Sequence, residues 1–402
     1  MKQRKSGKRL LPKLAPIALS IGLAVAAIAP TAVFAEGQCT QVLSGLRLPV
    51  GTTLTSHGNL LVAESGDGTP DSGRISIVDS NGNQRTLIDG LPSGAADVGT
   101  PSGPAGLFMQ GRALYVAIGE GDIAIMGPRP GTALLNPNGP NSPIFSSILE
   151  LSFSGSAEDH TTGFSMTPAD QDALAQGKIV WLRDGHRNIL RIRMVSDFPD
   201  YIPFPLPDVP DNIEATNPFG IVGFGPWFYV NDGGRNQTWR VNRFNGTLSQ
   251  FVAYPDVPNP LFGQGIGGPT IQAVPTGIEA RGHQLLVSLF RGAPFATGVS
   301  SIESVDALTG TDETLIPNLT TAIKTISLDR HRNGDLLVLE DSSEGPFFAG
   351  PGTVLLFQRA GDAPTTVADC LVGPTSMTLD KQNNKLYVTE DEGNLVSIPF
   401  QQ

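Results

Sequence analysis

One arrangement of apolar and polar positions recurs along the chain. In each copy a Pro-x-Gly or similar turn precedes an apolar stretch, a short polar turn follows, and a second apolar stretch contains a phrase such as Leu-Leu-Val or Leu-Tyr-Val. Two apolar stretches joined by a tight polar turn predict a β-hairpin. Six copies are present, with their second stretches at residues 59–64, 113–116, 227–232, 284–287, 335–340 and 385–390.

Further strands follow these hairpins. Each copy has a third strand, and four copies have an outer strand, at residues 84–88, 248–253, 313–316 and 365–368. The sixth copy has no outer strand of its own, whereas residues 40–43 resemble an outer strand without a blade. Repeats of about 40–50 residues are typical of β-propellers, and ring closure leaves no long sheet edge exposed. The sequence therefore predicts an all-β, six-bladed β-propeller in which the N-terminal strand closes the last blade.

The interval between the second and third copies is too long for one blade. Pro104 and Pro218, which open the two first strands, are 114 residues apart. The interval contains a predicted helix and a predicted hairpin, at residues 167–175, 178–182 and 189–195. We interpret residues 155–215 as an insertion into the second blade, within a single propeller domain at residues 36–402. A seventh blade is the alternative, since half of a blade pattern is present.

Residues 1–35 have the features of a signal peptide. They contain six basic residues and no acid, and the apolar run of residues 14–34 follows the basic start. Val33 and Ala35 suit signal peptidase, so we expect cleavage before Glu36. The alternative is an uncleaved membrane anchor, because the run is nearly long enough to span a bilayer. After cleavage we expect an exported protein, periplasmic or extracellular, without membrane attachment.

Composition narrows the classes of function. The net charge of the chain is −11, and it becomes −17 when the six basic residues of the N-terminal segment are removed. An acidic body repels phosphate backbones, so nucleic-acid binding is not expected. The chain also contains 47 Gly and 33 Pro, which favours many short strands joined by turns and excludes a helical bundle.

Two cysteines are present, Cys39 and Cys370. Export places both in an oxidising compartment, where disulfides persist. Cys39 precedes the N-terminal strand that is predicted to complete blade six, and Cys370 follows the outer strand of blade five at residues 365–368. We therefore predict a disulfide at the point where the ring closes. The alternative is two unrelated buried thiols.

Two segments resemble a known family. One is Asn-Pro-Phe-Gly at residues 217–220 with Asn-Asp-Gly-Gly-Arg-Asn at residues 231–236, and the other is Pro-Thr-Gly at residues 275–277 with residues 289–298. They resemble the ScyD/ScyE family of exported bacterial β-propellers, named from cyanobacterial gene clusters for the pigment scytonemin. The similarity extends over most of residues 40–400. It implies an exported propeller without an assigned activity, related to the NHL and SMP-30/gluconolactonase propellers.

Acidic residues at the ends of second strands are candidate metal ligands. In a propeller these ends lie on the same side as the starts of the first strands, here called the top face. Carboxylates around the channel mouth suit a hard cation such as Ca²⁺. The alternative is that each carboxylate hydrogen-bonds its own turn, in which case no cofactor is required. The candidate metal ligands are Glu64, Asp232, Glu340 and Glu390.

An enzymatic site is not assembled in the sequence. Asn217 lies where gluconolactonases, by the resemblance, place a metal-binding Asn. The other residues that enter first strands include no acid to complete such a site; they are Leu48, Gly103, Val274, Thr321 and Gly373. The histidines do not converge with a serine nucleophile either. We lean against an enzyme, and a metal-dependent hydrolase or lyase of the gluconolactonase type is the alternative.

The loops after several second strands are long and rich in Gly, Pro and Asn, whereas the turns on the opposite side are short. The long loops are residues 66–73, 121–143, 291–298 and 342–352. One-sided elaboration is typical of a binding face. We predict a binding or scaffold module, in secondary-metabolite or envelope processes, whose partner is a small molecule or an extracytoplasmic protein. The candidate ligand-binding residues are Asn217, Asp232, Arg235, Asn236, Phe290, Arg291, Phe295 and Phe347.

Overall fold

The computed structural model describes residues 39–328 and 334–400. The predicted signal peptide at residues 1–35 and the turn residue His331 lie outside them. The described residues form six sheets of four or five strands and four separate two-stranded hairpins. No helix among them is long and apolar enough to cross a membrane.

The six larger sheets are the blades, and each is named here from its innermost strand outward. Blades one to three contain β2 (Pro49–Leu54), β3 (Leu60–Glu64), β4 (Gly73–Val78) and β5 (Gln84–Leu91); β8 (Pro104–Gln110), β9 (Ala113–Ile118), β12 (Ser147–Phe153) and β15 (Ile189–Asp197); and β18 (Pro218–Phe224), β19 (Trp227–Asp232), β20 (Gln237–Asn242) and β21 (Leu248–Ala253). Blades four to six contain β24 (Pro275–Arg281), β25 (Gln284–Leu289), β26 (Ser300–Asp306) and β27 (Asp312–Leu319); β28 (Ala322–Ser327), β29 (Leu336–Glu340), β30 (Gly352–Phe357) and β31 (Thr365–Leu371); and β32 (Pro374–Asp380), β33 (Lys385–Glu390), β34 (Leu395–Pro399) and β1 (Thr40–Leu43).

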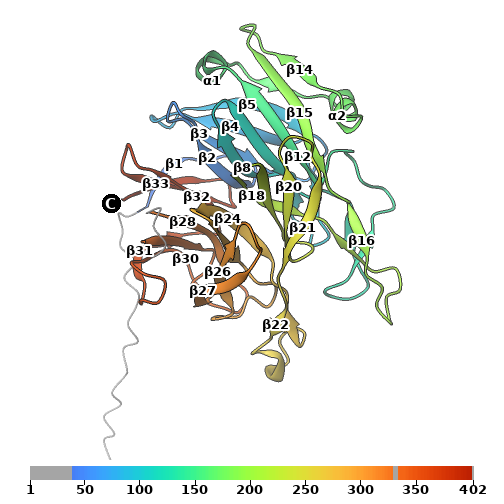
Figure 1. Cartoon of the computed structure of the whole chain (residues 1–402), viewed down its shortest axis with the longest axis vertical. Coiled ribbons are helices and arrows are strands. Elements are labelled where there is room, and N and C mark those ends of the chain that lie inside the picture. Colours follow the sequence, from blue (N-terminus) through green and yellow to red (C-terminus); the bar gives the residue numbers. More distant parts are fainter. Residues whose placement is uncertain (1–38, 329–333, 401–402) are drawn as a thin grey trace, which may run out of the picture. The chain divides into compact units, whose positions relative to one another are not determined.

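The blades form a closed ring. The innermost strands of neighbouring blades contact one another in sequence, from β2 through β8, β18, β24, β28 and β32 and back to β2 (Figure 1). In blades one to five the four named strands are antiparallel neighbours that follow one another in chain order, whereas in blade six β1 from the start of the chain pairs beside β34. The six-bladed prediction is confirmed, and the seven-bladed alternative is wrong.

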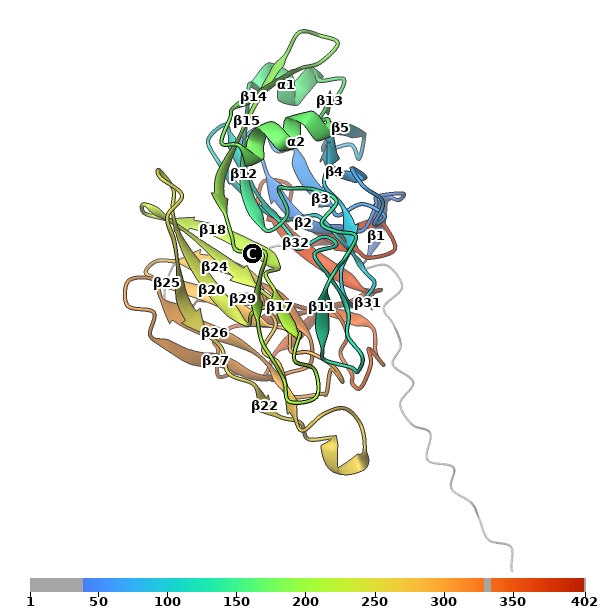
Figure 2. The same ribbon diagram turned by 90° about the vertical axis from the view of Figure 1, so that its right-hand side faces the viewer.

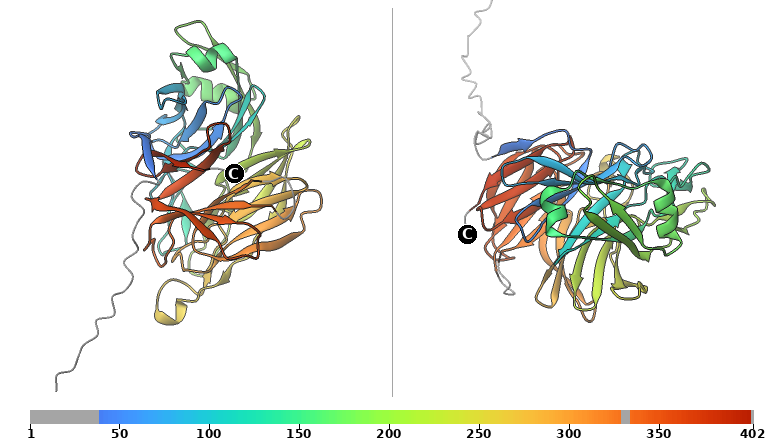
Figure 3. Two further views of the ribbon diagram at one scale, coloured as in Figure 1. Left: turned by 90° about the vertical axis from the view of Figure 1, so that its left-hand side faces the viewer. Right: turned by 90° about the horizontal axis from the view of Figure 1, so that it is seen from above.

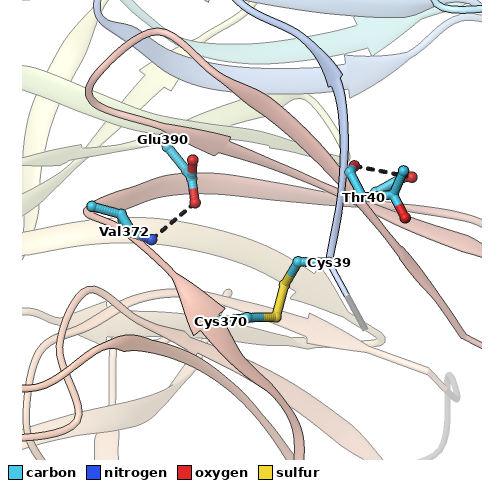
Figure 4. Close-up of a disulfide and its surroundings, with 6 residues drawn as sticks. Cys39, Thr40, Cys370, Val372 and Glu390 are labelled. Atoms are coloured by element: carbon cyan, nitrogen blue, oxygen red, sulfur yellow. Dashed lines mark hydrogen bonds between the residues drawn. A yellow bond between two sulfur atoms is a disulfide. The ribbon is translucent and has the colours of Figure 1, made fainter. Parts of the chain in front are cut away.

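The N-terminal strand completes the sixth blade, as predicted. β1 pairs antiparallel with β34, and Thr40 lies opposite Ser397. A disulfide joins Cys39, immediately before β1, to Cys370 in β31 of the fifth blade, with the two Cα atoms 6.2 Å apart (Figure 4). The predicted disulfide is confirmed. It connects blades five and six where the ring closes.

Glycines allow the innermost strands to approach one another. Gly51, Gly106, Gly220 and Gly277 occupy the same place in four first strands, two positions after the opening proline. A Cβ at any of these places would lie 1.9–2.5 Å from a backbone carbonyl oxygen of the next blade. The close approach leaves no space for a side chain, which explains the recurring Pro-x-Gly phrase. In the fifth blade the same place is occupied by Lys324.

The segment between β12 and β15 lies along the outer edge of the first two blades. It contains α1 (Gly155–His160), β13 (Phe164–Ser165), α2 (Pro168–Ala175) and β14 (Val180–Arg183). β13 pairs in parallel with β5 of blade one, and β14 pairs with β15 as a fifth strand of blade two. Both helices lie at this edge, near β14 and β15 (Figures 1 and 3). The sequence pattern predicts that β15 belongs to the insertion at residues 155–215. In the structure β15 pairs with β12 and is the regular fourth strand of blade two.

Apolar side chains of this segment fill the space between the first two blades. Phe164, Met166 and Leu174 are buried in one cluster together with side chains of β5 and β12. Thr167 is the N-cap of α2, and its side chain forms a capping box with Asp170, as the helix-start pattern predicts. The segment therefore extends the core across two blades.

Candidate functional site on the top face

The top face carries most of the irregular structure. Because the strands of a blade alternate in direction, the loops after second strands and the links from fourth strands to the next blade open on the same side. Four two-stranded hairpins lie there. They are β6 (Gly94–Ala95) with β7 (Pro101–Ser102), β10 (Ala124–Met126) with β11 (Ala133–Leu135), β16 (Tyr201–Pro203) with β17 (Ile213–Ala215), and β22 (Val257–Pro258) with β23 (Thr270–Ile271).

The β10–β11 and β16–β17 hairpins, here called the paired hairpins, pack against each other. Arg129 Nε lies 2.6 Å from Asp208 Oδ2 across the two hairpins, and Ala133 N donates to Asn212 Oδ1 at 2.9 Å. Figure 2 shows β11 beside β17. A small buried cluster lies between the hairpins, made of Ala124, Ala133, Ile213 and Ala215. These contacts fix the two hairpins to each other.

Exposed apolar side chains gather on the top-face loops. Of the fifteen large apolar side chains that are exposed in the described residues, ten lie there: Val98, Ile125, Met126, Leu135, Tyr201, Phe204, Phe262, Phe347, Phe348 and Val372. The paired hairpins carry five of them, and Met126 is the most exposed of the five at 65%. Except for Phe347, these residues were absent from the candidate ligand-binding set. Adjacent apolar residues inside a Gly- and Pro-rich loop, such as Ile125 and Met126, are the sequence signal that could have identified them.

The four predicted metal ligands lie on four different blades. Each ends a second strand opposite the first residue of the neighbouring first strand. Each carboxylate accepts a backbone N–H of the link that enters its own blade, at 2.6–2.9 Å. The acceptors are Glu64, Asp232, Glu340 and Glu390, and the respective donors are Arg47, Asn217, Thr320 and Val372; Figure 4 includes the last of these bonds.

The second carboxylate oxygens are also engaged. Partners of these carboxylates are Arg74, Trp239, Thr353 and Asn394. Burial raises the pKa of Asp232 and Glu340. In the described part of the chain these four side chains do not form a group with ligand atoms within 4.8 Å of one another. Metal binding by them stays a prediction, and their hydrogen bonds serve to attach each second strand to the entering link.

Glu120 is a top-face carboxylate without such partners. It is 5% exposed, and its carboxylate takes part in no hydrogen bond with the described residues. Its backbone N–H donates to Asn217 Oδ1 at 3.3 Å. Burial, together with the smaller effect of the charges of Asp97 and Asp232, raises the pKa of Glu120 to about 8. At neutral pH this side chain is mainly a carboxylic acid.

The candidate residues of blade three are mainly engaged within the chain. Arg235 N donates to Asp232 Oδ1 at 3.1 Å, and its guanidinium lies 5.0 Å from the centre of the Trp239 ring. Arg235 Nε is buried without a hydrogen-bond partner in the described residues. Asn236 Oδ1 accepts from Val274 N at 2.8 Å. Asn217, Asp232 and Asn236 thus fasten blade three to its links.

The candidate residues of blade four form an aromatic cluster with blade five. Phe295 stacks on Phe348, with ring centres 4.2 Å apart, and Phe290 lies 5.6 Å from Phe295. Arg291 is buried and donates to the carbonyl oxygens of Val299 and Pro255 at 3.2 and 3.1 Å. Burial lowers the pKa of Arg291. Phe347 is 58% exposed, so of these candidates it is the most accessible to a partner.

The central channel offers little space. It is lined by the first strands of all six blades and has a cavity volume of about 50 Å³, enough for a few waters. Lys324 is the one charged residue among the described residues that line it, and its Nζ donates to Ser376 Oγ at 3.2 Å. Burial lowers the pKa of Lys324 to about 8, although the charge of Glu279 opposes this effect. A pocket for a small organic ligand needs roughly 300–1,000 Å³.

Comparisons with known proteins concern the fold alone. No known protein-family profile matches the chain, and no curated protein sequence matches it. Among solved structures, virginiamycin B lyase from Staphylococcus aureus is 11% identical over 90% of this chain and 99% of that chain, with a TM-score of 0.45. A gluconolactonase from Xanthomonas campestris is 10% identical over 90% of this chain and 89% of that chain, with a TM-score of 0.49. The assignment of a six-bladed propeller rests on the sheet order and on the closure of the ring.

Proposed function

We propose that the protein is an exported, non-enzymatic binding module whose top face binds a second extracytoplasmic protein. The observation that carries the proposal is the set of exposed apolar side chains on the top-face loops. Exposed apolar area on loops positioned by a packed scaffold is typical of protein-interaction sites. The Cys39–Cys370 disulfide supports a periplasmic or extracellular location, because such bonds persist in oxidising compartments.

The resemblance to the ScyD/ScyE family supports the same proposal. The family consists of exported propellers without an assigned activity, and the phrases at residues 217–220 and 231–236 carry the likeness. We assign the chain to this family as part of the proposal. A role in secondary-metabolite or envelope processes follows, in which the propeller brings another protein into place.

A protein partner fits the top face better than a small molecule does. The central cavity of about 50 Å³ is several times smaller than ordinary ligand pockets. The polar candidates Asn217, Asp232, Asn236 and Arg291 are occupied by hydrogen bonds within the chain. The apolar residues on the projecting hairpins remain exposed and available for binding, and they suit a groove on a partner protein.

The test compares two variants of the mature chain, residues 36–402. In the top variant Ile125, Met126 and Leu135 are replaced by Ser. In the control variant Phe244 and Leu308, which are 81% and 66% exposed in turns on the opposite side, are replaced by Ser. Each protein is cross-linked in an envelope extract of the native host, and the captured proteins are measured by quantitative mass spectrometry. We expect at least one protein to be captured equally by the wild type and the control and about tenfold less by the top variant.

Two outcomes would contradict binding through the top face. If every captured protein is retained by the top variant, or is lost from the control variant instead, the top face is not the binding surface. Thermal unfolding of all three proteins is measured first, because surface substitutions of this kind should change stability by less than about 0.5 kcal/mol each.

A metal-dependent hydrolase or lyase of the gluconolactonase type is the second candidate. The observation in its favour is Glu120, a buried side chain whose carboxylate has no hydrogen bond in the described residues and whose backbone N–H donates to the side-chain oxygen of Asn217. Oxygen donors of this kind suit a hard cation such as Ca²⁺, which when bound would polarise a carbonyl group. Calorimetric titration with Ca²⁺ and assays with aldonolactones should show stoichiometric binding and turnover that Glu120→Gln abolishes. Absence of both from the wild type would remove this candidate and leave the binding module.

A further inference from the structure

A second group of polar side chains lies on the side opposite the top face, where α1 meets the first blade. His57 belongs to the turn between β2 and β3, and Glu158 and Asp159 belong to α1. His57 Nδ1 lies 3.2 Å from Asp159 Oδ1 and 3.6 Å from Glu158 Oε2. All three atoms lie within 4.8 Å of one another. Residues about one hundred positions apart in the sequence thus present one imidazole nitrogen and two carboxylate oxygens to a common point.

These separations match the edges of a metal coordination sphere. Zn²⁺ binds imidazole nitrogen and carboxylate oxygen at about 2.0–2.2 Å in tetrahedral sites, which places neighbouring ligand atoms about 3.3–3.6 Å apart. The two distances from His57 Nδ1, 3.2 and 3.6 Å, lie at this spacing.

The surroundings orient the ligand atoms. Glu158 is 4% exposed; its Oε1 accepts from the Thr55 hydroxyl and from Asn59 Nδ2, the latter at 2.9 Å. Its Oε2 receives no hydrogen bond from the described residues and lies toward His57. Arg85 donates to the carbonyl oxygens of Glu158 and Asp159, which fixes the end of α1. Metal ligands in proteins are commonly held by such outer contacts.

We propose that His57, Glu158 and Asp159 bind one divalent transition-metal ion of the Zn²⁺ class, with the remaining coordination position filled by water. The imidazole ligand favours Zn²⁺, Co²⁺ or Ni²⁺ over Ca²⁺ and Mg²⁺, which prefer oxygen ligands alone. Side-chain exposures of 43% for His57 and 42% for Asp159 leave the site open to solvent, so the ion can enter. When bound, it attaches the insertion to the turn of the first blade.

The experiment uses the mature chain without an affinity tag, after treatment with a chelator. Zn²⁺ binding is measured by calorimetry, and Co²⁺ is added as a spectroscopic probe. We expect one ion per chain, visible absorption bands of Co²⁺ with tetrahedral intensity, and affinity at least tenfold weaker in His57→Gln and Asp159→Asn. His283→Gln is the matched control, since His283 lies in another turn on the same side and packs against Phe224.

Several outcomes would overturn the proposal. Failure of the wild type to saturate at micromolar Zn²⁺ is one such outcome, and the absence of a tetrahedral Co²⁺ spectrum is another. Retention of full affinity in both His57→Gln and Asp159→Asn would place the ion elsewhere, for example at the exposed His160 and His186. Unfolding curves without metal show whether each variant is folded, and the Co²⁺ spectrum of the wild type decides the question even if one variant is not. Loss of protein capture by the top variant is a separate result, because the two sites share no residue.

Discussion

Two seams of the ring are held together by different means. At the closure, β1 has only four residues, of which the first two are exposed, and it pairs with β34 alone. The Cys39–Cys370 bond joins this short strand to the fifth blade. Between blades one and two, the insertion buries Phe164 and Leu174 in a core shared by both blades and uses no covalent bond.

The contrast shows what a propeller requires at each seam. A four-residue strand buries too little apolar area to resist fraying, so a covalent bond that lowers the entropy of the unfolded chain is the effective device there. The insertion contributes apolar area instead, and area stabilises by about 25 cal/mol for each Å² removed from water. The stability of the ring closure should therefore depend on the oxidation state of the two cysteines. The stability of the seam between blades one and two should depend on apolar packing.

The largest effect is expected at the closure. Replacing Cys39 and Cys370 by Ser should lower the free energy of unfolding by about 4–5 kcal/mol, because the bond closes a loop with a sequence separation of 331 residues. Denaturant unfolding measures the loss, and hydrogen exchange should show the amides of β1 opening before those of β13. Equal protection of β1 in the oxidised protein and the variant would show that the strand does not need the bond.

At the other seam, Phe164→Ala should cost about 3–4 kcal/mol, because it removes a fully buried ring from the shared core. The matched control is Phe244→Ala, since Phe244 is 81% exposed and its loss should cost less than about 0.5 kcal/mol. Both are measured by denaturant unfolding under oxidising conditions. Equal losses for the two variants would mean that the insertion contributes little to the seam.

The pH dependence of stability tests a third position, Glu120, which follows β9 of blade two and whose backbone N–H donates to Asn217 at the entry of blade three. The folded pKa of Glu120, about 8, is above its ordinary value of 4.5, so its neutral form is favoured in the native state. Its contribution is fully present below about pH 4.5 and is lost as the pH rises toward 8. Glu120→Gln should therefore be more stable than the wild type at pH 8, by up to about 4 kcal/mol before the cost of burying an amide without partners is subtracted, and the gap should narrow at pH 5. The exposed Glu313 supplies the control Glu313→Gln; a parallel pH profile for wild type and Glu120→Gln would contradict this assignment.

The smallest effect is expected for Gln171 in α2. Its side chain accepts from the Ser142 hydroxyl and donates to Asp71 Oδ1 and the Gly90 carbonyl, at 2.7–3.0 Å. Gln171→Ala should cost about 1–2 kcal/mol, because buried partners lose their hydrogen bonds. The exposed Gln176 of the same segment gives the control Gln176→Ala. Thermal unfolding of the two variants measures the difference in stability. An unchanged midpoint in both would show that apolar packing alone holds α2 in place.

The fold was predictable because its information is local and repeated. Four blades open with a Pro-x-Gly phrase, and every blade contains apolar stretches separated by polar turns, so strands and hairpins can be recognised within about 40–50 residues. The closure followed from a count, since the last copy has no outer strand and residues 40–43 have no blade. Cys39 and Cys370 then had to meet, although their positions are far apart in sequence.

The chemistry of the candidate sites depended on contacts that no local pattern contains. The sequence determined that Glu64 and Asp232 end second strands, but only the ring shows that linking N–H groups occupy their carboxylates. The sequence likewise contains His57 and Glu158 at distant positions, and only the packing of α1 against the first blade brings the two side chains together. Strand formation depends on periodic neighbours along the chain, whereas the spare hydrogen-bonding capacity of a side chain depends on whatever packs against it. That packing is set by long-range contacts between blades and their links.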